Sequence, residues 1–383
     1  MKKICFVTGT RADYGILAPV MKKIAESPQA ELQIIATNMH MSEQYGMTVH
    51  EIERDGFKVD IKIDSLIEGG SEKSTAESMS RVINGLTDAL NELKPDLIVI
   101  LGDRYEALAA ASTAVIYNIP IAHLHGGEIT EGAIDDKFRN AITQLSDLHF
   151  ASTLEYAQRI ISMGKTSDSV FHSGAPGAEI KDEYSNESSI AEEFYSKTGI
   201  YPGEPFILFA MHPVTTLRDK GLGEVKETLE AIDFFIKEGY KVLMTMPNSD
   251  PGTKEITDTL TKWASNSAQI VTLKSLGSVL FHYAMEIASV MVGNSSAALI
   301  GAPSYRLPAV NVGIRQKGRA HGITVIDSPG VKERIKSAIE LALSMEMKVV
   351  IMGQPVNALN PYYKEDASTF IADKIVNFVS KNN

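Results

Sequence analysis

Residues 97–101 read Leu-Ile-Val-Ile-Leu, an apolar run that ends at Gly102. A strand that is apolar at every position buries both of its faces, as strands do in a parallel sheet covered by helices on each side. Amphipathic stretches with helical spacing, such as Ser74–Leu93, separate this run from others of the same kind. The other runs in the first half are Ile4–Thr8, Leu32–Thr37, Ile119–Leu124 and His149–Ala151. This alternation predicts βαβ units and a parallel sheet.

A second series of the same kind follows a change in composition. Residues 175–204 contain few large apolar side chains and are predicted to connect two halves of the chain. The later apolar runs are Phe206–Met211, Lys241–Met246, Gln269–Thr272, Val290–Val292, Ala309–Val312 and Ile323–Ile326, and the expected helices are Glu224–Glu238, Thr253–Ala264 and Tyr363–Lys381. The predicted fold class is α/β, with two doubly wound domains at 1–175 and 176–360, a cleft between them, and a C-terminal helix within 361–383.

Composition excludes several classes of protein. The 383 residues include 37 Lys and Arg against 48 Asp and Glu, so the formal net charge is −11. Nucleic-acid binding is not expected, because it calls for a basic surface. The single cysteine, Cys5, excludes an internal disulfide and a cysteine-rich metal site. No apolar run reaches the about 7–15 residues of a signal peptide at the N-terminus or the about 20 residues of a membrane span. We expect a cytoplasmic protein without a membrane partner.

Two loops of the first half follow strands and carry arginine. The sequence GTRADYG at residues 9–15 combines Gly9, which permits a tight turn, with Arg11, which suits phosphate, and with Gly15 at the start of a helix. The sequence GDRYE at residues 102–106 carries Asp103 and Arg104. Asp103 either caps the next helix or supplies a base beside the Arg104 anion clamp.

The richest group of titratable residues is HLHGGEITEGAIDD at residues 123–136. Alternation along an extended segment places His123 and His125 on the same side. Five carboxylates are expected near them: Asp103, Glu128, Glu131, Asp135 and Asp136. Three interpretations stay open, namely a zinc site, general acid–base catalysis, and acidic residues at the positive end of a helix.

Polar loops also follow strands of the second half. His212 ends one run, and the next ends in PNSD at residues 247–250, whose polar groups suit a base or ribose. The sequence GNSS at 293–296 either seats a diphosphate at a helix start or caps that helix. The sequence GIRQKGR at 313–319 adds three cations, as an anion pocket or a solvated loop would. The loops of both halves together predict a nucleoside diphosphate with a reactive substituent, held across the cleft.

Seven strings of this sequence, in a single order, resemble the hydrolysing UDP-N-acetylglucosamine 2-epimerases of sialic and legionaminic acid synthesis. They are GTRADYG at 9–15, LKPDLIVILGDRYEALA at 93–109, HGGEITEGAIDD at 125–136, HPVTT at 212–216, PNSDPGTKE at 247–255, VGNSS at 292–296 and RQKGR at 315–319. The resemblance covers about residues 3 to 320. It implies a glycosyltransferase-B-like fold of two Rossmann-like domains, with the C-terminal helix crossing back to the first. It also implies homodimers or homotetramers and no metal or nicotinamide cofactor.

The resemblance further implies a reaction and a set of residues. UDP leaves the sugar by anti elimination across C1–C2, and water adds to the resulting 2-acetamidoglucal, so UDP-N-acetylglucosamine gives N-acetylmannosamine and UDP. The residues that would hold the UDP-sugar are Arg11, Gly15, Arg104, His212, Asn248, Asp250, Gly293, Ser295, Ser296 and Arg315. The acid–base candidates are Asp103, His125, Glu128, Glu131, Asp136 and His212.

Three positions depart from the better-known sialic acid enzymes. His125 stands where they carry Glu, Asn140 where they carry His after Arg139, and Gly301 where they carry a ribose-binding Glu. The HGGE form at 125–128 resembles a subgroup that includes enzymes for diacetamido-trideoxyhexoses, so UDP-2,4-diacetamido-2,4,6-trideoxyglucose is an alternative substrate. A non-hydrolysing 2-epimerase, against which the GTRADYG start argues, and a nucleotide-sugar sensor without turnover are further alternatives.

Overall fold

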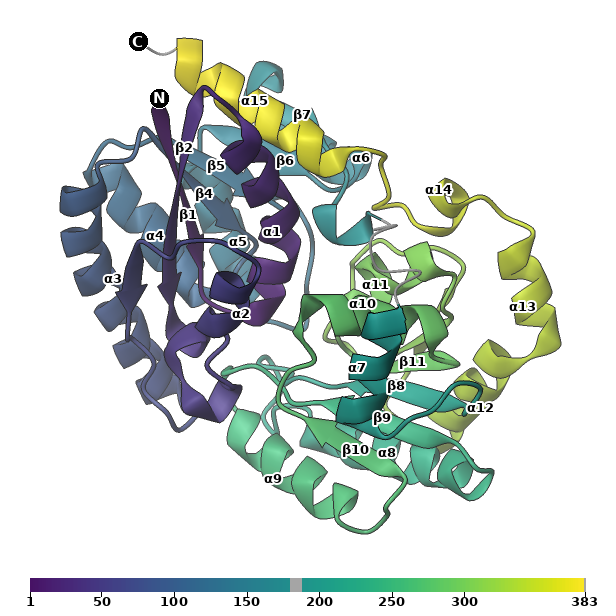
Figure 1. Cartoon of the computed structure of the whole chain (residues 1–383). Coiled ribbons are helices and arrows are strands. Elements are labelled where there is room, and N and C mark those ends of the chain that lie inside the picture. Colours follow the sequence, from purple (N-terminus) through teal and green to yellow (C-terminus); the bar gives the residue numbers. More distant parts are fainter. Residues whose placement is uncertain (180–187, 382–383) are drawn as a thin grey trace. The chain divides into compact units, whose positions relative to one another are not determined.

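The computed structural model describes residues 1–179 and 188–381, which form two compact units (Figure 1). Unit 1 comprises Met1–Glu128, Ile134–Gly177 and Lys364–Asn383, and unit 2 comprises Ile129–Ala133 and Ala178–Tyr363. The segment Ile129–Ala133, which the sequence boundaries place in the first domain, therefore belongs to unit 2. Neither unit is a continuous piece of chain.

Unit 1 is built on a parallel sheet of seven strands among the described residues, in the order β3-β2-β1-β4-β5-β6-β7. Its strands are β1 (Lys2–Thr8), β2 (Ala30–Thr37), β3 (Ile61–Ile63), β4 (Leu97–Leu101), β5 (Ile121–Leu124), β6 (Leu148–Ala151) and β7 (Val170–His172). Its helices are α1 (Arg11–Glu26), α2 (Val49–Arg54), α3 (Glu72–Leu93), α4 (Tyr105–Ile116), α5 (Asp135–Leu145), α6 (Leu154–Ser162) and α15 (Ala367–Lys381). The sequence analysis missed β3 and β7, because strands of three residues are too short to show a pattern.

Both faces of this sheet are covered by helices, as its apolar strands predict. In β1, Ile4 and Phe6 pack in the core beneath α1 and α15, whereas Cys5 and Val7 pack beneath α3 and α4. Figure 1 shows α15 lying along α1, although some 340 residues separate them in the sequence. The C-terminal helix is thus part of the unit 1 core.

Unit 2 repeats this architecture with a parallel sheet in the order β10-β9-β8-β11-β12-β13. Its strands are β8 (Phe206–Ala210), β9 (Lys241–Thr245), β10 (Ile270–Leu273), β11 (Val290–Gly293), β12 (Ala309–Val312) and β13 (Val325–Ser328). Its helices are α7 (Ser188–Thr198), α8 (Leu222–Lys237), α9 (Thr253–Ala264), α10 (Gly277–Ile287), α11 (Ala297–Ile300), α12 (Lys332–Leu343), α13 (Met345–Met352) and α14 (Val356–Leu359). The prediction of two doubly wound α/β halves is confirmed.

The segment 175–204, expected to be a connection, contains α7. Ile190 and Phe194 lie one helical turn apart, and both are buried in the unit 2 core with Phe206 and Leu208 of β8. Two apolar side chains on one face are enough to attach a short helix, although the composition of the segment is polar. Residues 180–187 of the expected connection lie outside the described residues.

Three buried histidines of unit 1 resist protonation. Burial lowers the pKa of His40 to about 3, that of His123 to about 4 and that of His149 to about 3. The ring nitrogens of His40 lie 3.0 Å from Thr8 Oγ1 and 2.8 Å from Thr48 Oγ1. Neither ring nitrogen of His149 has a hydrogen-bond partner within residues 1–179 and 188–381.

Acidification is therefore expected to destabilise unit 1. The unfolded histidines titrate near pH 6.5, above their native pKa values, so the unfolded chain binds more protons as the pH falls. The three neutral histidines contribute fully to the free energy of unfolding above about pH 6.5. This contribution is lost as the pH falls toward 3–4, by up to about 1.4 kcal/mol per pH unit for each histidine. Urea unfolding followed by circular dichroism between pH 7 and pH 5 measures the slope. His149→Leu should flatten it by about one proton and the exposed control His50→Leu should not; equal slopes for both variants would contradict this account.

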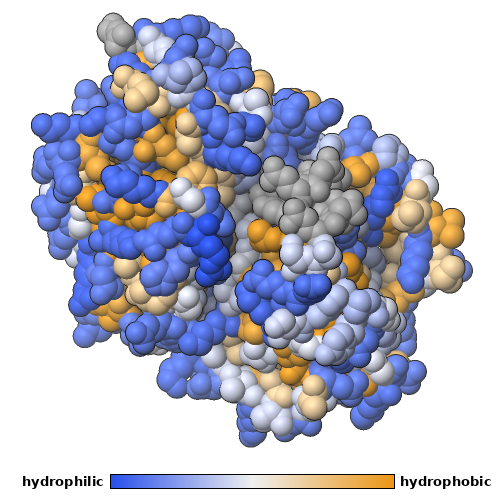
Figure 2. Space-filling model, viewed as in Figure 1, coloured by the Kyte–Doolittle hydropathy of each residue, from blue (hydrophilic) through white to orange (hydrophobic). Residues whose placement is uncertain are grey.

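The surface agrees with the acidic, polar composition. Figure 2 shows a face that is mostly hydrophilic, with scattered apolar patches. The most exposed apolar side chains include Met345, Val349 and Met352 of α13. None of the described helices combines the length and the hydropathy that crossing a membrane requires.

Candidate active site

The predicted site residues lie where the strand order of each sheet reverses. In unit 1, β1 pairs with both β2 and β4, and the loops after β1 and β4 carry Arg11 and Asp103. In unit 2, β8 pairs with both β9 and β11, and the loops after β8 and β11 carry His212 and Ser295. Ligands of doubly wound sheets bind beyond the carboxyl ends of the strands at such reversals. The topology therefore places a candidate subsite in each unit.

The loop after β1 is held tightly against α4. Thr10 caps α1, its side chain accepting a hydrogen bond from Asp13 N at 3.2 Å. A Cβ atom on Gly9 would lie 2.5 Å from Glu106 Oε1, so only glycine fits there. Arg11 is the first residue of α1, and Gly15 lies in its second turn. The loop thus presents the N-terminus of a 16-residue helix, with its unpaired N–H groups.

Arg104 is buried in an ion pair beside this loop. Its Nε donates to Glu106 Oε1 at 2.5 Å, and both side chains are more than nine-tenths buried. Glu106 is in the first turn of α4, and its side chain fills the space that a Cβ atom at position 9 would need. The sequence analysis named Arg104 as an anion clamp but missed Glu106, the carboxylate that fixes the direction of the guanidinium.

A buried arginine organises the carboxylates. Arg139 of α5 donates through Nη2 to Asp103 Oδ2, and through Nη1 to Asp136 Oδ1 at 3.3 Å and to the carbonyl oxygen of Glu128 at 3.0 Å. The Arg139 side chain is 1% exposed, while those of Asp103 and Asp136 are 23% and 24% exposed. Asp103 does not cap α4, whose N-cap is Arg104. Both carboxylates are thus fixed by one cation and still reach solvent.

His123 and His125 have different environments. His123 is fully buried in β5, with Nε2 2.7 Å from the carbonyl oxygen of Gly102 and Nδ1 3.3 Å from Thr143 Oγ1. His125 follows the strand with a φ of +62°, in the left-handed region. The prediction that alternation places both imidazoles on one side is therefore wrong, because the extended backbone ends at Leu124. His123 is a structural residue, and His125 is the candidate for chemistry.

The Glu128 side chain contacts His125 and is not exposed to solvent. The Glu128 carboxylate is fully buried, with Oε1 2.7 Å from His125 Nδ1 and 2.6 Å from Ser152 Oγ, which donates to it. The other ring nitrogen of His125, Nε2, has no hydrogen-bond partner among the described residues. A carboxylate at Nδ1 fixes the ring and its tautomer and leaves Nε2 for proton transfer. Glu128, predicted as an acid–base candidate, is placed as an orienting group.

Glu131, unlike the other carboxylates predicted near the two histidines, is a residue of unit 2. It belongs to the Ile129–Ala133 segment of unit 2, and its Oε2 lies 2.8 Å from Lys317 Nζ in an exposed ion pair. Asp135 and Asp136 open α5, as the helix-start interpretation expects. The zinc interpretation finds no support, because no group of three His, Cys, Asp or Glu side chains among the described residues has the geometry to hold a metal ion.

In unit 2, Asn294 connects the loops after β8 and β11. His212 N donates to Asn294 Oδ1 at 2.7 Å, and Asn294 Nδ2 donates to the His212 carbonyl oxygen at 2.9 Å. The His212 ring is held in turn, because Asn248 N donates to its Nδ1 at 3.3 Å. Gly293 has a φ of +142°, and a Cβ atom there would lie 2.0 Å from the carbonyl oxygen of Ala210. Glycine is therefore required where these strands meet.

The loop after β12 closes onto the same asparagine. Arg315 Nη1 and Gln316 Nε2 both donate to the Asn294 carbonyl oxygen, at 3.1 and 2.9 Å. Ser295 and Ser296 follow directly and precede the short helix α11. Ser296, its N-cap, makes no side-chain cap hydrogen bond. Ser295 Oγ accepts a hydrogen bond from Ala297 N at 3.4 Å, so the capping interpretation is supported at Ser295 and not at Ser296.

The comparison with protein families decides the class of this site. The family model described as UDP-N-acetylglucosamine 2-epimerase matches residues 22–376. This chain belongs to the UDP-N-acetylglucosamine 2-epimerase family. The family resemblance predicted from the sequence is confirmed.

Relatives of this epimerase-family chain cover most or all of its length. Polysialic acid biosynthesis protein P7 of Escherichia coli is 34% identical over 383 residues, covering 100% of this chain and 96% of the relative. GDP/UDP-N,N'-diacetylbacillosamine 2-epimerase (hydrolyzing) of Campylobacter jejuni is 35% identical over 330 residues, 85% of this chain and 84% of the relative. The crystal structure of the Neisseria meningitidis UDP-GlcNAc 2-epimerase bound to UDP-GlcNAc aligns with a TM-score of 0.81 at 18% identity, over 98% and 100% of the two chains. This likeness confirms the predicted fold, two Rossmann-like domains of the glycosyltransferase-B type.

The sequence analysis missed several residues of this epimerase-family site. Arg139, Ser152 and Glu106 hold the predicted site residues Asp103, Glu128 and Arg104 in place, and Gln316 donates to Asn294, which directly precedes Ser295. Ser152 lies outside the seven strings and Arg139 lies three residues beyond one of them, and the folded sheet brings them to Glu128 and Asp103. Asp250, a predicted ligand contact, is buried before α9.

Proposed function

We propose that this chain is a hydrolysing UDP-sugar 2-epimerase that converts UDP-N-acetylglucosamine and water into N-acetylmannosamine and UDP. The observation that carries the proposal is the group of Asp103 and Asp136, held by one buried arginine, on the same sheet edge as His125. Such a group supplies more than one proton-transfer residue, as an elimination followed by a hydration requires. The names of the E. coli and C. jejuni relatives support the assignment.

The elimination requires a base and the hydration requires an acid, and residues of unit 1 can supply both. In the elimination, a base takes the C2 proton, the C2–H electron pair forms the C1–C2 double bond, and UDP leaves with the C1–O pair. Asp103 is the proposed base, since its carboxylate is oriented by Arg139 and its side chain still reaches solvent. In the hydration, an acid gives a proton to C2 on the opposite face and the C1–C2 double-bond pair forms the new C2–H bond. Water adds its oxygen to C1 and releases its surplus proton to solvent. His125, with Nδ1 on Glu128, is the proposed partner in this second transfer.

The departing UDP carries most of the developing negative charge. Donors aimed at a leaving group stabilise the transition state more than the ground state. We assign this role to Arg11 and Arg104 in unit 1, and to His212 and Arg315 with the Ser295-Ser296 pair in unit 2. Asn248 is the proposed contact for the nucleoside.

A second substrate is favoured by one specific observation. The C. jejuni relative, at 35% identity, is named for N,N'-diacetylbacillosamine. UDP-2,4-diacetamido-2,4,6-trideoxyglucose would undergo the same elimination and hydration, because its C1 and C2 carry the same groups.

Product analysis with both nucleotide sugars tests the proposal. The purified chain is incubated with each substrate in D₂O, and the products are followed by NMR and mass spectrometry. We expect UDP and the free C2-inverted sugar with one deuterium at C2. A C2 epimer still attached to UDP would indicate a non-hydrolysing epimerase, and UDP binding without deuterium at C2 would indicate a sensor; either result contradicts the proposal. Heat-denatured protein provides the control for spontaneous hydrolysis.

A further inference from the structure

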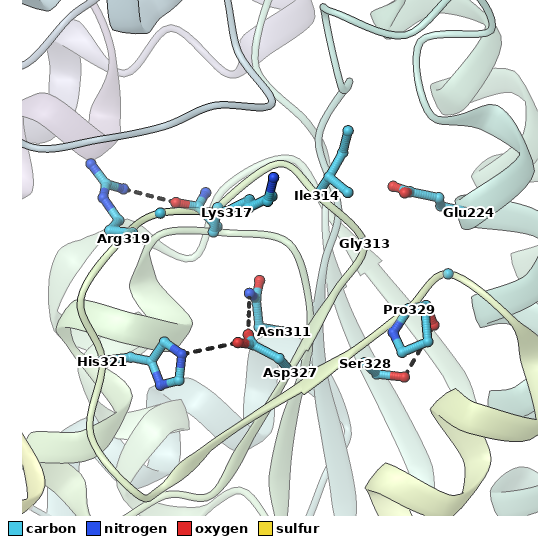
Figure 3. Close-up of a pocket in the computed structure, with 13 residues that line it drawn as sticks. Glu224, Asn311, Gly313, Ile314, Lys317, Arg319, His321, Asp327, Ser328 and Pro329 are labelled. Atoms are coloured by element: carbon cyan, nitrogen blue, oxygen red, sulfur yellow. Dashed lines mark hydrogen bonds and ion pairs between the residues drawn. The ribbon is translucent and has the colours of Figure 1, made fainter.

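A pocket of about 450 Å³ lies in unit 2 at the carboxyl ends of β12 and β13 (Figure 3). Asn311 and Asp327 form its floor, the loop at 313–319 its roof, and Glu224 of α8 closes one side. This volume falls within the range of small-molecule sites, about 300–1,000 Å³. None of the roles assigned above uses its floor residues.

The floor presents an unsatisfied acceptor. Asn311 is 3% exposed and donates through Nδ2 to Asp327 Oδ1 at 2.8 Å. His321 Nε2 lies 3.1 Å from Asp327 Oδ2, which lowers the pKa of Asp327 and keeps it an acceptor. The Asn311 amide must therefore turn its nitrogen to Asp327 and its oxygen away. That oxygen, Oδ1, has no hydrogen-bond partner in the described part of the chain, an arrangement that costs about 1–3 kcal/mol unless a ligand or water satisfies it.

Glu224 presents a second acceptor on the side of the pocket. Figure 3 shows its carboxylate facing the loop at Gly313 and Ile314. Its Oε2 is buried without a partner in the described residues. Burial raises the pKa of Glu224, a hydrogen bond from the Ile314 backbone to the carboxylate partly offsets the rise, and the nearby Asp219 adds to it. A hydroxyl or N–H donor placed beside Oε2 would give this buried oxygen a hydrogen-bond partner.

The cations around the pocket are already paired. Lys317 Nζ lies 2.8 Å from Glu131 Oε2, and Arg319 Nη1 donates to Gln316 Oε1 at 2.9 Å. His321 is paired with Asp327. An anionic ligand would face the Asn311 and Glu224 acceptors, and the basic side chains that could attract it already have partners. The open positions therefore suit a neutral molecule rich in hydrogen-bond donors.

We propose that this pocket binds a neutral, hydroxyl-rich monosaccharide, whose hydroxyl groups donate to Asn311 Oδ1 and Glu224 Oε2. The sugar lies under the loop at 313–319. From the same loop, Arg315 and Gln316 donate to the Asn294 carbonyl oxygen. A sugar in the pocket supports the loop in the conformation that contacts Asn294. Sugar binding and nucleotide binding in unit 2 are thereby coupled.

The proposed coupling between sugar and UDP binding rests on the proposed function, whereas the proposed binding of a sugar in the pocket does not. Because coupling between two sites is reciprocal, a bound sugar tightens UDP by the factor by which UDP tightens the sugar. We expect a factor of about five or more, the low end of such couplings.

The test is a titration of the full chain with D-glucose, N-acetylglucosamine and N-acetylmannosamine at millimolar concentrations. Amide NMR shifts of Gly313, Gly318 and Gly330 report on the pocket. We expect saturable shifts with at least one sugar and a dissociation constant raised tenfold or more in Glu224→Gln and Asn311→Leu. Glu230→Gln, an exposed position on the same helix, is the matched control and should bind normally.

Further outcomes separate the pocket from the nucleotide subsite. Ser295→Ala should retain sugar binding at these glycines; loss there would place the sugar in the nucleotide subsite and overturn the proposal. No shift with any of the three sugars, or shifts with inorganic phosphate instead, would overturn it as well. Sugar binding in a chain that fails to bind UDP would support the pocket and refute the epimerase assignment. Glu224→Gln keeps the shape of the side chain, so the test does not depend on Asn311→Leu folding.

Discussion

Replacing Asp103 with asparagine is expected to lower kcat by about 10²- to 10⁴-fold, the usual contribution of a general acid or base, while UDP still binds. Asparagine has the size of aspartate but cannot accept the C2 proton. Asp103 and Asp136 both contact buried Arg139 and are 23% and 24% exposed, and of the two Asp103 follows β4 directly, at the strand end where a ligand is expected. Steady-state release of UDP gives kcat, and calorimetry gives the UDP dissociation constant.

Two variants act as controls for Asp103→Asn. Asp88→Asn makes the same chemical change at an exposed position of α3 and should leave kcat unchanged. Arg11→Ala should show the opposite pattern, with UDP affinity reduced about tenfold or more, as for a lost hydrogen bond to a charged group. Full activity of Asp103→Asn would remove Asp103 from the mechanism, whatever happens to the other two variants.

Replacing Arg139 with leucine is expected to reduce the free energy of unfolding of unit 1 by about 3 kcal/mol. Removing one member of a buried ion pair typically costs about 3–5 kcal/mol, because the partner charge is left uncompensated. The lower end applies here, since Asp103 and Asp136 keep 23% and 24% of their side chains in water. The Glu128 carbonyl oxygen also loses a donor. Urea denaturation, with hydrogen exchange of the β4 and β5 amides, measures the loss in unit 1.

Matched substitutions separate the charge of Arg139 from its shape. Arg139→Lys keeps the charge but cannot donate to Asp103 and Asp136 in a planar fork, so an intermediate loss is expected. Arg81→Leu, at an exposed position on α3, should change stability by no more than about 0.5 kcal/mol. A comparably small change for Arg139→Leu would show that the two carboxylates do not depend on the guanidinium.

The regular elements of this fold follow from local sequence. The run Leu97–Leu101 is β4 and the stretch Thr253–Ala264 is α9, with the predicted boundaries. Each has a clear periodicity and a clear stop, so no distant contact is needed to define it. The edge strands β3 and β7 lack such a pattern, because three residues pair only after a neighbouring strand is in place. The helix α7 was missed because only Ile190 and Phe194 carry its apolar face.

The candidate site was predictable at the strand ends and not beyond them. Asp103, His125 and Ser295 follow strands, and parallel topology gathers strand ends at one edge. The tie between Asp103 and Arg139 spans 36 residues, and that between Glu128 and Ser152 spans 24; no local pattern encodes either. The left-handed backbone of His125 also lies outside what alternation describes. Local sequence therefore indicated the groups proposed to contact a ligand, and folding supplied the residues that orient them.

Because α15 belongs to the core of unit 1 but follows unit 2 in the sequence, unit 1 cannot complete its core early in protein synthesis. Residues of α15, among them Ile371 and Ile375, complete the core that contains Leu17 and Met21 of α1. The ribosome adds them after it has added the whole of unit 2. Until then the nascent chain carries an uncovered apolar strip on α1, the kind of surface that chaperones recognise and that aggregates when unprotected. A premature stop after Tyr363 would leave that strip permanently exposed, although every residue proposed to touch the substrate had been made.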